Sequence, residues 1–304
     1  MECTSLTAID IPNSLINIGE NAFEGCSSLS SFTVPYSLTS IGNNAFKSCS
    51  SLSSVSIFSK EIGDWFSGTD IKEVIIGDQV TNIGEYAFYC CRNLSSITIP
   101  ATVISIGEKA FAGCSSLSSF IVPCSVTSIG NDAFEGCSGL ISVGFFCKEI
   151  GDWFSGTDIK EIIIGDEVTI IGECAFANCR NLASSNIPNN VTSIGKSAFG
   201  GCTSLSSFSI SNSVTNIGES AFRGCSSLSS FTIPNSVTNI GKTAFKNCSS
   251  LSSFTILNSV TSIGEGVFSG CSSLTSITIT ILNDVVPVLT FGNTKKPLSN
   301  KIMA

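Results

Sequence analysis

The chain alternates apolar and polar residues in a pattern that recurs every 23 residues. In the unit Cys225–Asn247, the apolar residues Leu228, Phe231 and Ile233 follow the spacing L-x-x-L-x-L. A serine and a threonine alternate with the last two of them, and this alternation predicts a short strand with one buried face. Pro234 ends the predicted strand, because proline has no N–H group to donate to a ladder.

The second half of the same unit returns the chain to its starting point. Val237 and Ile240 are predicted to point inward, and Gly241 lets the chain bend. Ala244 and Phe245 then form a short helical or 3₁₀ turn on the far side. A unit of this length cannot bury its own apolar face. We therefore expect stacked units whose strands pair in parallel about 4.8 Å apart and share one core.

One cysteine marks the start of each unit, at positions 3, 26, 49, 91, 114, 137, 179, 202, 225, 248 and 271. Two steps span 42 residues, which predicts units of 19 residues at 49–67 and 137–155. The units after them begin with Gly68 and Gly156, where cysteine is expected. The pattern predicts a single solenoid of about 13 units over residues 3–293, with a C-terminal tail at 294–304.

A longer repeat is superimposed on the short one. Residues 61–73 (EIGDWFSGTDIKE) recur identically at 149–161, which is 88 residues later. Since 88 is one unit of 19 and three of 23, a block of four units was duplicated whole.

Two columns of identical residues follow from the period. Most units contribute a phenylalanine, at positions 23, 46, 88, 111, 134, 176, 199, 222, 245 and 268. We interpret this row as a core spine, with a ligand groove as the alternative. The cysteine column is interpreted as buried free thiols, which behave as small hydrophobic groups. Cys90, Cys124, Cys147 and Cys174 lie off the column and their redox state stays open, although Cys124 stands at a turn and is expected to be exposed.

Composition excludes several classes of function. The net charge of −8 comes without a basic cluster before the tail, which argues against nucleic acid as a partner. No apolar run approaches the roughly 20 residues of a membrane span, so no membrane insertion is expected. No signal peptide is recognisable, since the first residues run directly into the first unit.

Catalytic chemistry finds no support in the motifs. The chain has no histidine, and therefore no Ser-His or Cys-His pair. Glycine-rich phosphate loops and the G-x-S-x-G elbow are absent as well. The acidic stretch 61–78 lacks the spacing of a known calcium loop. We expect no catalytic residues, no cofactor and no metal site; an enzyme is the most remote alternative.

The unit C-x-x-L-x-x-[FIV]-x-[IV]-P-x-x-[VL]-x-x-I-G-x-x-A-F-x-x resembles the BspA-like, or Treponema-pallidum-type, leucine-rich repeat family. The segment Ile217–Cys225 carries the distinguishing part of the motif. The resemblance implies a curved leucine-rich-repeat solenoid. Its parallel β-sheet lines the concave face, and short 3₁₀, helical or extended segments form the convex face. It also implies extracellular or cell-surface display and adhesion to host matrix or cell-surface proteins.

These features predict a non-enzymatic protein-interaction or adhesion scaffold, expected to be a monomer, with a carbohydrate-binding solenoid as the alternative. Strand residues that point outward form a ladder of hydroxyls, for which a binding surface and plain solubility are both open. After each short unit, acidic and apolar residues replace the hydroxyls. Tryptophan occurs only in the short units, as a contact residue or as packing. The candidate partner-binding residues are Trp65, Glu73, Ile75, Trp153, Glu161, Ile163, Ser207, Ser209, Ser230, Thr232, Ser253 and Thr255.

Overall fold

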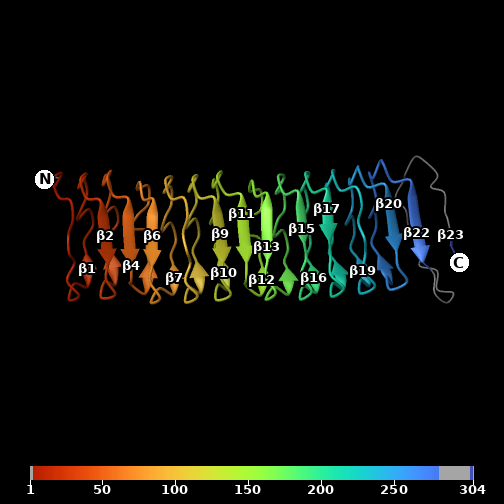
Figure 1. Cartoon of the computed structure of the whole chain (residues 1–304), viewed down its shortest axis with the longest axis horizontal. Helices are drawn as coiled ribbons and strands as arrows, with labels where there is room; N and C mark the ends of the chain where they lie inside the picture. Colours follow the sequence, from red (N-terminus) through yellow and green to blue (C-terminus); the bar gives the residue numbers. More distant parts are fainter. Residues whose placement is uncertain (1–2, 281–301, 304) are drawn as a thin grey trace. The chain divides into compact units, whose positions relative to one another are not determined.

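A computed structural model describes residues 3–280 and 302–303 of the chain. These residues fall into two compact units, Met1–Cys147 and Lys148–Ala304. Within each unit, short parallel strands follow one another and are joined by turns (Figure 1), and the described residues contain no helix. The predicted parallel-strand solenoid class is confirmed. Residues 281–293 of the predicted array, and nearly all of the tail, lie outside the described residues.

The first unit carries the predicted strands as one set, which we call the first ladder. Neighbouring strands pair in parallel, with Phe32 opposite Val55 and Val55 opposite Val74. Side chains alternate between buried and exposed along β2, as the pattern predicted. The strands of this ladder in the first unit are β2 (Ser31–Val34), β4 (Ser54–Ile57), β6 (Glu73–Ile76), β9 (Ser119–Val122) and β11 (Ser142–Phe145).

A second ladder was not predicted. It forms where the isoleucine of the Ile-Gly motif and the residue before it pair in parallel with the same two residues of a neighbouring repeat, as in Ile83 opposite Ile106. Its isoleucines are buried, apart from the half-buried Ile263, and the residue before each isoleucine faces outward. In the first unit its strands are β1 (Asn17–Ile18), β3 (Ser40–Ile41), β5 (Glu61–Ile62), β7 (Asn82–Ile83), β8 (Ser105–Ile106) and β10 (Ser128–Ile129).

The second unit repeats both ladders. Its first-ladder strands are β13 (Glu161–Ile164), β15 (Ser184–Asn186), β17 (Ser207–Ser209), β20 (Ser253–Ile256), β22 (Ser276–Thr280) and β23 (Ile302–Met303). Its second-ladder strands are β12 (Glu149–Ile150), β14 (Ile170–Ile171), β16 (Ser193–Ile194), β18 (Asn216–Ile217), β19 (Asn239–Ile240) and β21 (Ser262–Ile263).

Among the described residues, three predicted strands do not form, at 8–11, 96–99 and 230–233. The segment 230–233 has no ladder partner, although Phe231 and Ile233 are buried and Ser230 and Thr232 are exposed, as predicted. The predicted helical turn at Ala244 and Phe245 is also simpler than expected, because the segment is a run of hydrogen-bonded turns. Burial of the apolar positions thus persists where regular hydrogen bonding does not.

The phenylalanine column is a core spine, as predicted. Consecutive rings stack with centroids 5.4 Å apart between Phe88 and Phe111, and 5.5 Å apart between Phe199 and Phe222. Nearly all of the column is buried; Phe23, in the first described repeat, is only half-buried. In several repeats a strand phenylalanine meets the spine edge-on, as Phe120 meets Phe134 at 4.6 Å. Offset and edge-on ring pairs of this kind add to the apolar burial.

The column cysteines are buried except for Cys3, and from Cys49 onwards each of these thiols links two repeats. The Sγ–H group of Cys114 donates to the carbonyl oxygen of Phe88 at 3.2 Å, and that of Cys225 donates to the carbonyl oxygen of Phe199 at 3.1 Å. Cys124 is exposed, as expected. Cys90 and Cys174 are half-buried, and Cys147 is buried.

A glycine follows each isoleucine of the second ladder and sets how closely the repeats approach. A Cβ atom at Gly130 would lie 2.3 Å from the backbone nitrogen of Glu108, and one at Gly218 would lie 2.5 Å from the carbonyl carbon of Gly195. Real Cβ atoms essentially never come that close to backbone atoms. Main chain therefore packs directly on main chain along this column.

Candidate functional site

The outward face of the first ladder holds most of the candidate residues. Glu73 and Ile75 point outward from β6, and Glu161 and Ile163 point outward from β13. Ile75 is 49% exposed and Ile163 is 50% exposed, which is unusual for isoleucine in a folded protein. Each unit therefore presents one exposed acidic and apolar pair in place of two hydroxyls.

The six candidate hydroxyl residues, Ser207, Ser209, Ser230, Thr232, Ser253 and Thr255, are all exposed. Among them, Ser209 donates to Asn186 Oδ1 at 2.6 Å. The other five make no side-chain hydrogen bond within the described part of the chain. Threonines beside the second ladder behave differently, since Thr215 Oγ1 and Thr238 Oγ1 each donate to the carbonyl oxygen one repeat earlier. First-ladder hydroxyls are thus largely left for solvent or a partner.

A third isoleucine exposed on this face was not predicted from the sequence. Ile121 points outward from β9 and is 58% exposed. The sequence contains a sign of this exposed residue, because Ile121 stands where most repeats carry serine or threonine.

In the first short repeat, Phe66 and Thr69 take the positions that a spine phenylalanine and a column cysteine occupy in full-length repeats. Phe66 occupies the spine between Phe46 and Phe88, with centroids 5.2 and 6.3 Å away. Thr69 takes the cysteine position, because its hydroxyl donates to the carbonyl oxygen of Phe66 at 2.6 Å. Cys91 Sγ donates to the same oxygen at 3.1 Å.

The assignment of Gly68 and Gly156 to the cysteine position is therefore wrong by one residue. Gly68 has a φ of 68°, as Gly25 before Cys26 has a φ of 73°. These glycines correspond to the residue before each column cysteine, and Thr69 and Thr157 correspond to the cysteines. The residues that a short repeat lacks relative to a full-length repeat are therefore lost at several points along it. The spacing of the cysteines alone could not show this.

Trp65 packs into the second ladder. Its side chain is 8% exposed, and its ring meets Phe66 edge-on at 6.3 Å. The indole lies so close to Gly63 that a Cβ there would stand 2.6 Å from Nε1. The packing interpretation thus holds for Trp65. Trp153 is half-buried and lies against Gly151 in the same way, with Nε1 2.7 Å from the position of a Cβ.

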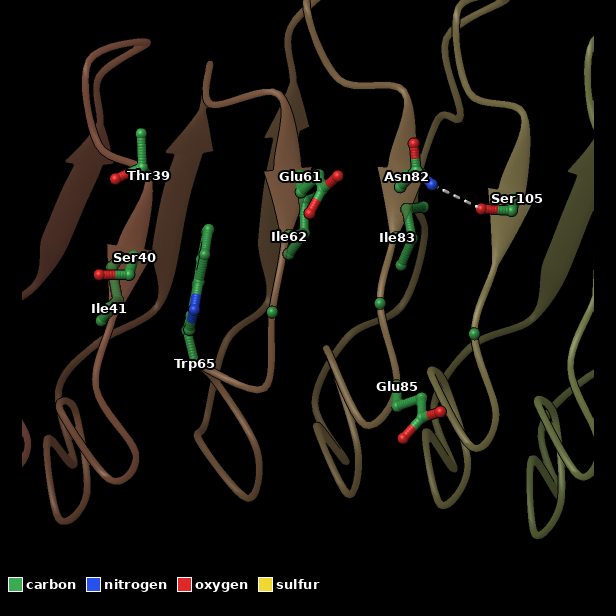
Figure 2. A pocket seen from close by; sticks show the side chains of 13 residues that line it. Thr39, Ser40, Ile41, Glu61, Ile62, Trp65, Asn82, Ile83, Glu85 and Ser105 are labelled. Atoms are coloured by element: carbon green, nitrogen blue, oxygen red, sulfur yellow. Dashed lines mark hydrogen bonds between the residues drawn. The ribbon is translucent and has the colours of Figure 1, made fainter. Parts of the chain in front are cut away.

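A hollow of about 380 Å³ opens beside Trp65. Strands β3 and β5 belong to separate sheets, so the second ladder is interrupted between them. Figure 2 shows the indole standing in this gap, between Ile41 and Ile62. Outward side chains of β3, β5, β7 and β8 line the hollow, together with the acidic residue that follows the Ile-Gly of β7: Ser40, Glu61, Asn82, Ser105 and Glu85.

Two carboxyl groups next to the tryptophans have shifted pKa values. Burial raises the pKa of Asp64, and a hydrogen bond with Ser67 partly offsets that rise. Burial, followed by the charge of Glu173, raises the pKa of Asp152. Neither pKa shift is by itself evidence for a pair of catalytic carboxyl groups. Across the residues that the structure describes, no group of three or more possible metal ligands comes together, and no helix could span a membrane.

The family model for the BspA type leucine rich repeat region matches six copies over residues 1–65, 60–183 and 169–296. The chain belongs to this family. A search of curated proteins gave no match.

One solved structure supports that assignment, and two others are similar in sequence. A leucine-rich repeat protein from Bacteroides ovatus is 30% identical, with a TM-score of 0.61, over 91% of this chain and 67% of that one. A leucine rich cell surface protein from Faecalibacterium prausnitzii is 28% identical, with a TM-score of 0.45, over 88% and 84% of the two chains. The leucine rich repeat protein of T. pallidum is 27% identical, with a TM-score of 0.37, over 66% and 75%.

Proposed function

We propose that this BspA-type repeat protein is a non-enzymatic adhesion scaffold, displayed at the cell surface as a monomer, that binds host matrix or cell-surface proteins. The family and fold are those of repeat scaffolds used for protein interaction. Surface display and adhesion are what the family resemblance implies. Nothing in the fold requires the exposed acidic and apolar residues of the first ladder, and this observation carries the proposal.

The chemistry of the first-ladder face suits a protein partner. Ile75 and Ile163 offer apolar contact area, and Glu73 and Glu161 beside them offer charge that selects the partner. The surrounding free hydroxyls form a polar rim of the kind that borders apolar contacts in protein interfaces.

A binding screen with a matched charge control tests the proposal. The purified chain is applied to immobilised matrix proteins and glycans, beside the double variant Glu73→Lys with Glu161→Lys. We expect a matrix-protein ligand whose binding weakens about tenfold or more in this variant, because like charges then oppose the partner. The glycan arm tests the carbohydrate-binding alternative.

The control reverses two exposed acidic residues that lie just beyond the same strands, Asp78→Lys with Asp166→Lys. It makes the same change in net charge in the same two repeats, but away from the outward face. Equal binding by wild type and the Glu73/Glu161 variant would show that the partner docks elsewhere. Size-exclusion chromatography with light scattering measures the oligomeric state.

A further inference from the structure

We propose that the hollow beside Trp65 is a binding site for an arginine or lysine side chain of a basic peptide segment. The proposal rests on the proposed function as a protein-binding scaffold, and it adds a second site on the other ladder. It is carried by the interrupted ladder, the groups that line the hollow and the charge of the first unit.

The hollow exists because the second ladder is broken between β3 and β5. Between Val34 and Ile41 the chain uses seven residue steps, and between the equivalent Ile57 and Ile62 it uses five. The shortened connection coincides with the loss of pairing between β3 and β5, where the indole stands instead. The site thus belongs to the short repeat.

Most donors that line the hollow are already used within the protein. Thr39 Oγ1 donates to the carbonyl oxygen of Ile16 at 3.2 Å, and Ser40 Oγ donates to Asn17 Oδ1 at 2.7 Å. Asn82 Nδ2 donates to Ser105 Oγ at 3.0 Å, as the dashed line in Figure 2 shows. A ligand would therefore find few free donors.

Two carboxylates and one N–H are among the groups of the hollow that have no partner in the described part of the chain. Glu61 and Glu85 are exposed and make no ion pair within the described part of the chain. Trp65 Nε1–H donates no hydrogen bond there, although the side chain is more than nine-tenths buried. A buried indole N–H usually has an acceptor. The ligand that fits supplies several donors and positive charge for the carboxylates, and one acceptor for the indole.

A basic peptide meets both needs. A guanidinium or ammonium group donates to carboxylates in charge-assisted hydrogen bonds, and arginine does so in bidentate geometry. The peptide carbonyl groups next to it are acceptors for the indole N–H, and the indole itself favours a nearby cation. The charge of the first unit also favours a basic ligand, because this unit has 13 acidic and 5 basic residues, a net charge of −8. Such a field raises the local concentration of cationic segments.

The test uses the full chain with Trp153→Phe, so that Trp65 is the sole tryptophan. The probe is a short fluorescein-labelled peptide with several arginines, and the control probe carries citrulline, the neutral isostere, in their place. We expect saturable binding of the arginine peptide at low ionic strength, accompanied by a change in Trp65 emission, and no such change with citrulline.

Two matched variants locate the site. In Glu61→Gln with Glu85→Gln, affinity for the arginine peptide should fall about tenfold or more, since both charge-assisted contacts are lost. In Asp10→Asn with Glu135→Gln, two exposed charges are removed from the same unit away from the hollow, and affinity should stay within about twofold. Since all four side chains are exposed, the fold should be retained, which circular dichroism checks.

Equal weakening in both double variants would show a diffuse electrostatic attraction and overturn the proposal. Binding that leaves Trp65 emission unchanged, or no binding of the arginine peptide, would overturn it as well. These outcomes are separate from those of the matrix-protein screen. A chain that loses its ligand through Glu73 and Glu161 but not through Glu61 and Glu85 keeps the proposed function and lacks this second site.

Discussion

The two units have cores of the same kind but differ in surface charge. Each contributes five buried column cysteines and a stacked phenylalanine spine. The first unit has a net charge of −8, whereas the second has 10 acidic and 10 basic residues. After Ile-Gly, the first unit places Glu85 and Glu108 in succession, while the second alternates acid and base.

The alternation in the second unit forms ion pairs. Lys196 Nζ lies 2.9 Å from Glu173 Oε1, and Lys242 Nζ lies 3.0 Å from Glu265 Oε2. Pairs as exposed as these add little to stability, so the difference between the units concerns partners and not folding. The repeat fixes what points inward, and each repeat is free to vary what points outward.

The largest expected effect is a loss of stability in alkali, which tests whether the cores of the two units respond in the same way. Burial raises the pKa of Cys49, Cys179 and Cys271 to about 11 from an ordinary value of 9.0. Between these pH values the unfolded chain has lost protons that the folded chain retains, so stability falls as pH rises. Each thiol contributes a loss of about 1.4 kcal/mol per pH unit across this window. Burial strongly raises the pKa of four column thiols in the first unit and of five in the second, so we expect both units to unfold within this window.

The tryptophans make the measurement specific, because each unit contains one. Fluorescence of Trp153→Phe and Trp65→Phe variants reports the first and second unit respectively, and thiolate absorbance follows ionisation. Unfolding of one unit well below pH 9, with the other intact, would contradict the equivalence of the two cores.

A smaller effect is expected from the spine. Phe111 and Phe222 are fully buried and stacked on both sides. Replacing either by alanine should cost about 3–5 kcal/mol in its own unit, from lost burial and the cavity left behind. Hydrogen exchange measured by mass spectrometry assigns the loss to a unit. Ile121→Ala, at an exposed position, is the control and should change stability by less than about 0.5 kcal/mol.

The smallest effect concerns a place where the cores differ. Ser185 stands on the inward face of β15, opposite Phe208 and at the position that Phe120 occupies in the first unit. Its hydroxyl is buried and has no hydrogen-bond partner. Ser185→Val should therefore stabilise the second unit by about 1–2 kcal/mol. Thermal melting compares it with Ser207→Val on the exposed face, which should gain nothing.

Much of the fold follows from the period, and the parts that do not are short or depend on neighbours. Leu228, Phe231 and Ile233 identify the inward face because burial repeats wherever the spacing does. The second ladder escaped prediction because a strand such as Asn82–Ile83 is too short for an alternation to show. Thr69 was missed because a hydroxyl replaces a thiol one residue away from the expected place. The hollow beside Trp65 depends on a pairing that is lost between two repeats, which no single unit reveals.

The glycine column also bears on how so repetitive a chain avoids misassembly. Since no Cβ fits where Gly130 meets Glu108, a slip by one or a few residues would force a side chain against the neighbouring backbone. Only a slip by an entire repeat would restore the fit, and near-identical repeats would accept it. The repeats at Trp65 and Trp153 reduce that degeneracy, because their shortened turns match only each other. We expect the two short repeats to fix the register in which the repeats stack during folding, so that each full-length repeat packs on its own neighbour and not on a copy of it.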